Sequence, residues 1–107
     1  MQDLQIKVER STDPPVVRLA GEIDMETAPE VQQTLDELIE SDGLFELDLA
    51  AVTFIDSSGL HLLLDAANRL NGSDPLTLIS VPPRVLRLME IVGLTNAPSL
   101  NVQKQDD

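Results

Sequence analysis

Residues 45–60 read FELDLAAVTFIDSSGL, a predicted strand that passes directly into a predicted helix. Every second residue from Phe45 to Leu49 is apolar and the residues between are acidic, which is the period-two pattern of a half-buried strand. The strand-like run ends at Ile55, and the next residue, Asp56, is of a type that caps a helix by accepting hydrogen bonds from first-turn amides. The stretch therefore predicts a strand–helix unit of the kind from which parallel sheets are built.

Similar patterns predict four more strands and two more helices. The strands cover 4–8, 16–19, 76–79 and 99–103, and the helices begin after Thr27 and at Pro82. The order β-β-α-β-α-β-α-β indicates an α/β fold with a mixed, mainly parallel sheet, whose first two strands pair antiparallel. Because two strands carry charges at alternate positions, we expect the helices mostly on one face of the sheet. With 107 residues, 42% of them hydrophobic, the chain fits one domain, 1–107.

The ends and buried faces of the helices follow from spacing. Thr27 and Glu30 have the spacing of a capping box at the start of the first helix. Residues typical of helix ends follow the three helices at Gly43, at 71–75 and at Gly93. The predicted buried faces are Val31, Leu35, Leu38 and Ile39; then Leu60, Leu63, Leu64, Ala67 and Leu70; then Val85, Leu88, Met89 and Val92. Leu62 falls opposite the second of these faces and is predicted to be exposed.

Acidic residues dominate the charge, with 19 Asp and Glu against 7 Lys and Arg and a formal net charge of −12. This balance argues against binding to nucleic acid or to an anionic membrane, since few cations are present to meet phosphate groups. The absence of Cys excludes disulfides and Cys-ligated zinc, and a single His cannot build a His-rich metal site, so we expect no metal and no cofactor. The N-terminus lacks the apolar run of a signal peptide, and we expect a cytoplasmic protein.

The acids are concentrated in the first half of the chain. Residues 1–53 hold 13 acids and 3 bases, whereas residues 54–107 hold 6 acids and 4 bases. One interpretation is a charged surface that keeps the protein dispersed. The other is a surface that attracts the basic face of a partner.

The turn at 56–58 is the candidate site for chemistry, because open α/β sheets usually place their sites at the carboxyl ends of strands. Ser57 and Ser58 are interpretable simply as small polar residues that join a strand to a helix. A nucleophilic serine assisted by His61 is a second interpretation, but the G-x-S-x-G elbow and an orienting group are missing. An anion-binding helix start is a third, which Asp56 and the lack of a nearby cation oppose.

A phosphoacceptor is the fourth interpretation of these two serines. A phosphate adds about −1.5 to −2 charges, and the dipole of the helix favours it at this position. The added charge beside Asp56 would still spoil a docking surface matched to the unmodified protein. A switch of this kind needs no catalytic residue in the chain, so we expect a binding protein and not an enzyme.

The motifs Gly21-Glu22-Ile23-Asp24 and Asp56-Ser57-Ser58-Gly59-Leu60 resemble those of anti-sigma factor antagonists of the STAS domain family. Asp48-Leu49, 81–85 and 91–94 extend the resemblance to nearly the whole chain. It implies a βα superhelix with its helices mainly on one face. It also implies that the unmodified protein binds an anti-sigma factor that is a serine kinase, which frees the sigma factor. Phosphorylation of Ser57 then separates the two, and a phosphatase resets the switch.

The resemblance assigns expected roles to residues of this chain. Ser57 is the expected phosphorylation site, and no residue is expected to be catalytic. The expected partner-binding residues are Asp24, Asp56, Ser57, Ser58, Gly59, Leu60, His61 and Leu62. The expected partners are an anti-sigma factor with serine kinase activity and a serine phosphatase, bound by a monomer or weak dimer. The alternative is an accessory or scaffold STAS subunit of a stress-sensing or transport assembly.

Overall fold

In residues 4–70 and 74–105, which the computed structural model describes, five strands form one sheet in the order β1-β2-β3-β4-β5. The strands are β1 (Gln5–Glu9), β2 (Val16–Ile23), β3 (Glu46–Ile55), β4 (Leu76–Val81) and β5 (Leu100–Lys104). Strand β1 pairs antiparallel with β2, and the other neighbours pair parallel. The predicted mixed, mainly parallel sheet with consecutive strands side by side is confirmed.

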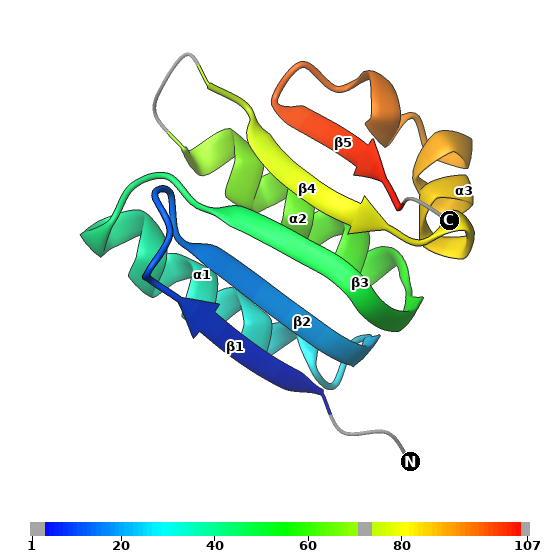
Figure 1. Cartoon of the computed structure of the whole chain (residues 1–107). Helices are drawn as coiled ribbons and strands as arrows, with labels where there is room; N and C mark the ends of the chain where they lie inside the picture. The colour runs from blue at the N-terminus through cyan, green and yellow to red at the C-terminus, as the bar shows by residue number, and fades with distance from the viewer. Residues whose placement is uncertain (1–3, 71–73, 106–107) are drawn as a thin grey trace.

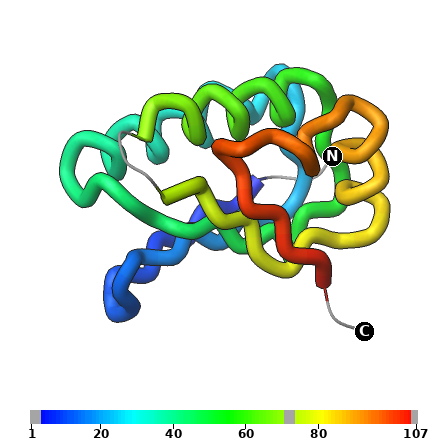
Figure 2. The backbone as a smooth tube through the Cα atoms, turned by 90° about the horizontal axis from the view of Figure 1, so that it is seen from above, coloured from blue at the N-terminus to red at the C-terminus, as the bar shows by residue number. Residues whose placement is uncertain are grey.

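The strands are connected through α1 (Ala28–Ser41), α2 (Ser57–Arg69), α3 (Pro83–Ile91) and a short 3-10 helix, η1 (Leu94–Asn96). Figure 1 shows α1 and α2 behind the sheet and α3 at one end of it, and Figure 2, turned by 90°, shows α1 and α2 together on one side of the sheet. The predicted one-sided arrangement is therefore confirmed. Its core consists mainly of Leu, Val and Ile side chains around the single buried aromatic residue, Phe45. Throughout the described ranges, no helix is long and apolar enough to cross a membrane.

Strand β2 continues past its predicted end at Leu19 as far as Ile23. The added residues do not alternate in polarity, so the strand pattern is lost there. Gly21 has a φ of +112°, and the pairing with β3 shifts register between Gly21 and Glu22. A glycine takes this backbone conformation at little cost, and such irregularities often re-aim a side chain near a site. Because β2 runs to Ile23, Asp24 directly follows the end of this strand.

The buried faces of α2 and α3 differ from the predicted ones. Leu62 is only 4% exposed, so its predicted exposure is wrong; α2 packs against α1 as well as against the sheet. In α3, Val85 and Met89 are buried as predicted, but Leu88 is 37% and Val92 is 57% exposed. Helix α3 has nine residues and lies at one end of the sheet, so only a narrow stripe of it meets a neighbour.

The predicted helix ends have different outcomes. Gly43 and Gly93 follow α1 and α3 closely, as predicted. The predicted end of α2 at 71–75 falls partly on residues 71–73, which lie outside the described residues.

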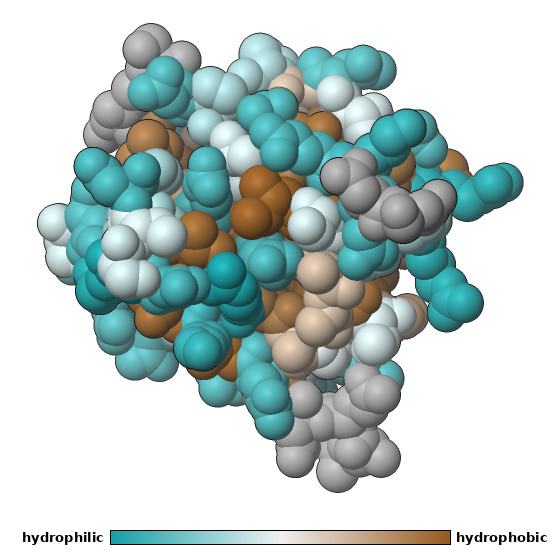
Figure 3. All heavy atoms as spheres, in the orientation of Figure 1, coloured by the Kyte–Doolittle hydropathy of each residue, from teal (hydrophilic) through white to brown (hydrophobic). Residues whose placement is uncertain are grey.

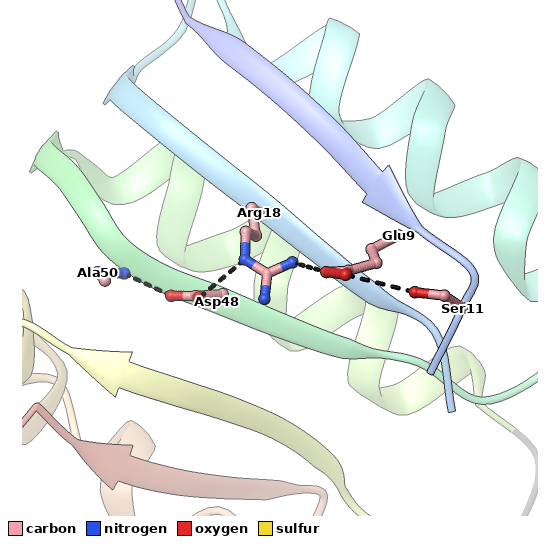
Figure 4. Close-up of polar contacts among 5 residues, drawn as sticks. All are labelled: Glu9, Ser11, Arg18, Asp48 and Ala50. Atoms are coloured by element: carbon pink, nitrogen blue, oxygen red, sulfur yellow. Dashed lines mark hydrogen bonds and ion pairs between the residues drawn. The ribbon is translucent and has the colours of Figure 1, made fainter. Parts of the chain in front are cut away.

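The sheet face turned away from the helices carries an ionic bridge across three strands. Arg18 of β2 contacts Glu9 of β1, and its Nε lies 3.5 Å from Oδ2 of Asp48 in β3 (Figure 4). The hydrogen bond from Arg18 lowers the pKa of Glu9 below its usual value. Figure 3 views this face and shows polar and apolar residues interspersed on it. The bridge ties β1 to β2 and β3, the two strands that lead to the site described below.

Candidate functional site

The carboxyl ends of strands β2 and β3 lie side by side at the same end of the sheet. Ile23 is the register partner of Ile55, and the amide of Asp56 donates to the carbonyl of Ile23 at 3.1 Å. Asp24 and Asp56 are therefore the first residues after two neighbouring parallel strands, and both lie at the same end of the sheet. The two motifs that carried the predicted site, 21–24 and 56–60, lie far apart in the sequence and meet here. This end of the sheet, formed by the carboxyl ends of the strands, is where α/β sheets commonly place their sites.

Asp56 caps helix α2, as predicted. Its Oδ1 accepts hydrogen bonds from the amides of Ser58 at 2.8 Å and of Gly59 at 3.2 Å. The cap fixes the first turn and thereby the positions of both serines. Ser57 is exposed, whereas Ser58 is half-buried. An enzyme approaching from solvent thus meets Ser57 first, a difference between the two serines that spacing in the sequence cannot reveal.

The loop before α1 is held by Asp24 and not by a capping box. Oδ1 of Asp24 accepts from the amides of Glu26 at 2.9 Å and Thr27 at 3.0 Å. The Thr27 hydroxyl donates to the carbonyl of Glu22 and accepts from the amide of Asp24, and it makes no cap bond to the helix. The predicted capping box is therefore wrong, because this threonine faces back toward β2. The bonds fix a tight loop with Met25 75% exposed.

A groove of about 780 Å³ lies between α1, its preceding loop and the start of α2. Its lining consists of Met25, Ala28, Pro29, Gln32, Ser57, Ser58, His61 and Leu62. The lining is largely apolar, carries no acid, and has Ser57 and His61 as exposed polar groups on one side. The sequence analysis did not predict four of these lining residues, Met25, Ala28, Pro29 and Gln32. Their only signal was their closeness in the chain to Asp24.

The predicted partner-binding residues fall into two groups. Asp24, Asp56, Ser57, Ser58 and His61 are exposed or half-buried at the edge of the sheet. Gly59, Leu60 and Leu62 are buried, and Leu62 also lines the groove. A Cβ atom on Gly59 would lie 2.5 Å from Cγ1 of Ile55, which shows that this glycine permits close packing of α2 on the strands.

A polar contact further along α1 and α2 joins the two helices that wall the groove. Arg69 of α2 pairs with Asp36 of α1, and Gln32 donates to the same carboxylate at 2.9 Å. The hydrogen bond from Arg69, and after it the one from Gln32, lowers the pKa of Asp36 below its usual value. Because Gln32 also lines the groove, this contact helps to fix the spacing of its walls.

The exposed polar groups of the groove are the Ser57 hydroxyl and the His61 imidazole. His61 shares the groove with Ser57, but no hydrogen bond joins it to either serine in the described part of the chain. The same ranges, 4–70 and 74–105, contain no group of three or more His, Cys, Asp or Glu placed to hold a metal ion. An exposed hydroxyl on a capped helix start, beside a largely apolar groove, can accept a phosphoryl group and can meet a partner.

The chain is similar to known proteins in sequence and in fold. The family model described as "Mlab, STAS domain" matches residues 6–102. The anti-sigma-B factor antagonist of Listeria monocytogenes is 37% identical over 95 residues, which cover 87% of this chain and 82% of that protein. The crystal structure of an anti-sigma factor antagonist from Mycobacterium paratuberculosis has a TM-score of 0.83 at 28% identity, over 94% of this chain and 86% of that one. Unphosphorylated SpoIIAA shares the fold, with a TM-score of 0.68 at 20% identity over 91% and 87%.

The fold and the site define a class of small α/β domains that present a serine at a helix start beside a largely apolar groove. The chain belongs to the STAS domain family, as the motifs around Asp24 and Ser57 predicted. The relatives described above are anti-sigma factor antagonists, which are regulatory proteins.

Proposed function

We propose that this protein is an anti-sigma factor antagonist that works by partner switching. In its unmodified form it binds an anti-sigma factor with serine kinase activity, and the sigma factor is released. The kinase then transfers the γ-phosphoryl group of ATP to Oγ of Ser57, with loss of the hydroxyl proton and formation of ADP. The phosphorylated protein leaves, and a serine phosphatase hydrolyses the ester. This cycle would run in the cytoplasm, where ATP and sigma factors are found.

The observation that carries the proposal is the exposed Ser57 on the rim of the groove between α1 and α2. A phosphate there would place about two negative charges against a largely apolar surface. Desolvating such a charge is costly, so a partner seated in the groove would be expelled. We propose that Asp24 and Asp56 contribute by holding the loop and the helix start on either side of the groove.

The test uses immobilised wild-type protein and four variants to capture the partner from a lysate of the source cells. We expect wild type to retain a small ATP-binding protein and Ser57→Glu to lose it, while Ser57→Gln, the neutral control of equal size, retains more of it than Ser57→Glu does. On addition of ATP and Mg²⁺, wild type and Ser58→Ala should release the partner, and Ser57→Ala should keep it. Retention by Ser57→Glu, or release from Ser57→Ala, would contradict the proposal.

The accessory-subunit alternative gives a different pattern in the same experiment. A scaffold holds its neighbours irrespective of the charge at Ser57, so every variant would capture the same large set of proteins. Size-exclusion chromatography provides a second readout. A switch protein elutes as a monomer or weak dimer, whereas a scaffold subunit co-elutes with a large assembly.

A further inference from the structure

The groove beside Ser57 contains one side chain that can carry a positive charge. Of the residues that line it, His61 alone is basic, and it is exposed. It is also the only histidine in the chain. A protonated imidazole is a cation and donates hydrogen bonds from both of its ring nitrogens. A phosphate attached to Ser57 would add about −1.5 to −2 charges within this groove.

The first turn of α2 offers few free hydrogen-bond donors to a phosphate on Ser57. The amides of Ser58 and Gly59, which a helix start would normally present to an anion, already donate to Asp56. The carboxylate of Asp56 is itself negative and repels a neighbouring phosphate. Among the residues that line the groove, the group that can meet the phosphate with a positive charge lies further along α2.

His61 is placed to be that partner. Ser57 and His61 are four residues apart on α2, which puts their side chains on one face about one turn apart. Both line the same groove, and the side chains that face His61 across it, Gln32 of α1 and Met25 of the preceding loop, are uncharged. The charged group at the same four-residue spacing on the other side of His61 is Asp65, which is half-buried. A phosphate on Ser57 would therefore compete for His61 with Asp65.

We propose that His61 binds the phosphate of modified Ser57 and holds it against the face of α2 that lines the groove. The inference rests on the proposed function, because it concerns the phosphorylated form of the same serine. The contact is a charge-assisted hydrogen bond from the imidazolium to a phosphate oxygen. It keeps the phosphate over the surface that the partner would occupy, so the modified state blocks docking by position as well as by charge.

The test measures the ionisation of the phosphate itself. Phosphoserine is incorporated at position 57 during translation, and its ³¹P chemical shift is followed from about pH 8 to about pH 4, around its usual second pKa of about 6. A nearby cation favours the dianion, so we expect the midpoint in wild type to lie about 0.5 below that in His61→Gln. His61→Lys, which keeps a positive charge, should restore the low midpoint. Asn68→Gln, an exposed change elsewhere on α2, should leave it unchanged.

Equal midpoints in wild type and His61→Gln would overturn the role of His61. This outcome is separable from a failure of partner switching, because the phosphate is installed without any kinase. If the phosphoserine protein and the unmodified protein captured the same partner equally well, the proposed function would fail whatever the midpoint. If the phosphate expelled the partner with no shift in its midpoint, the proposed function would stand and His61 would have no part in holding the phosphate.

Discussion

Gly59 lies so close to Ile55 that a methyl group on its Cα would come within 2.5 Å of Cγ1 of that side chain. The same methyl group would lie 2.8 Å from Cγ2 of Ile23, the register partner of Ile55. Both isoleucines are fully buried, so neither has open space into which it can move. Gly59 therefore allows the first turn of α2 to pack closely against β2 and β3. This close packing places Ser57 at the end of the sheet where the two strands end.

Gly59→Ala is expected to destabilise the fold. Overpacking of this kind typically lowers the free energy of unfolding by about 1–3 kcal/mol, which outweighs the gain of about 1 kcal/mol in helix propensity. Urea unfolding followed by far-UV circular dichroism measures the change, since the chain has no Trp or Tyr to report by fluorescence. Asn68→Ala, at an exposed site on the same helix, is the control and should change the value by less than about 0.5 kcal/mol. A Gly59→Ala protein as stable as wild type would show that α2 can shift without strain.

The loop before α1 supports a second prediction. Asp24→Ala removes the acceptor of the Glu26 and Thr27 amides and should lower the free energy of unfolding by about 1 kcal/mol. Glu30→Ala should change it by less than about 0.5 kcal/mol, because Glu30 makes no cap bond to Thr27. Thermal unfolding by circular dichroism compares the two variants. A larger loss for Glu30→Ala than for Asp24→Ala would restore the capping box that spacing suggested.

The order of the elements could be predicted because it reflects burial along single elements. The alternation from Phe45 to Leu49 follows the face that β3 turns to the core, and the same is true of β4. The cap at Asp56 was predictable for a similar reason, since it joins a residue to amides two and three positions later. Features that depend on neighbours close in sequence are visible in the sequence.

The features that could not be predicted depend on neighbours distant in sequence. Leu62 is buried on a helix that packs against α1 as well as against the sheet, and a helical projection of α2 alone shows only the face turned to the sheet. Thr27 bonds to Glu22 because β2 runs further than its pattern of polarity. The groove was missed for the same reason, since half of its lining comes from α1 and its loop.

Helix α3 supports a third prediction, on the side chains that differ from their predicted burial. Met89 is fully buried, so Met89→Ala should lower the free energy of unfolding by about 2–5 kcal/mol. Leu88→Ala should lower it by less than about 1 kcal/mol, since Leu88 already meets solvent. Urea midpoints of the two variants, measured side by side, test this. Similar losses at the two positions would mean that α3 turns a different face to the sheet.

The ionic bridge of Arg18 supports the last prediction, which concerns pH. The hydrogen bond from Arg18 holds the pKa of Glu9 below its usual value of 4.5. Between those two values the unfolded chain binds more protons than the folded one, so stability rises with pH. The contribution is therefore complete above the usual value and is lost as the pH falls through the lowered one. Glu9 is half-buried and reaches solvent, so the effect is small and weakens in salt.

Arg18→Gln removes this contribution together with the contact to Asp48, whereas the repulsion among the acids changes with pH in both proteins. Near neutral pH and at low salt, the variant should unfold at a lower urea concentration than wild type. The difference between the two midpoints should shrink as the pH falls below about 4.5. Lys7→Gln, on the neighbouring strand, removes a cation without removing the hydrogen bond to Glu9 and should show much less of this trend. A difference that stays constant from neutral to acid pH would mean that Arg18 stabilises the sheet by packing, without any contribution from its charge.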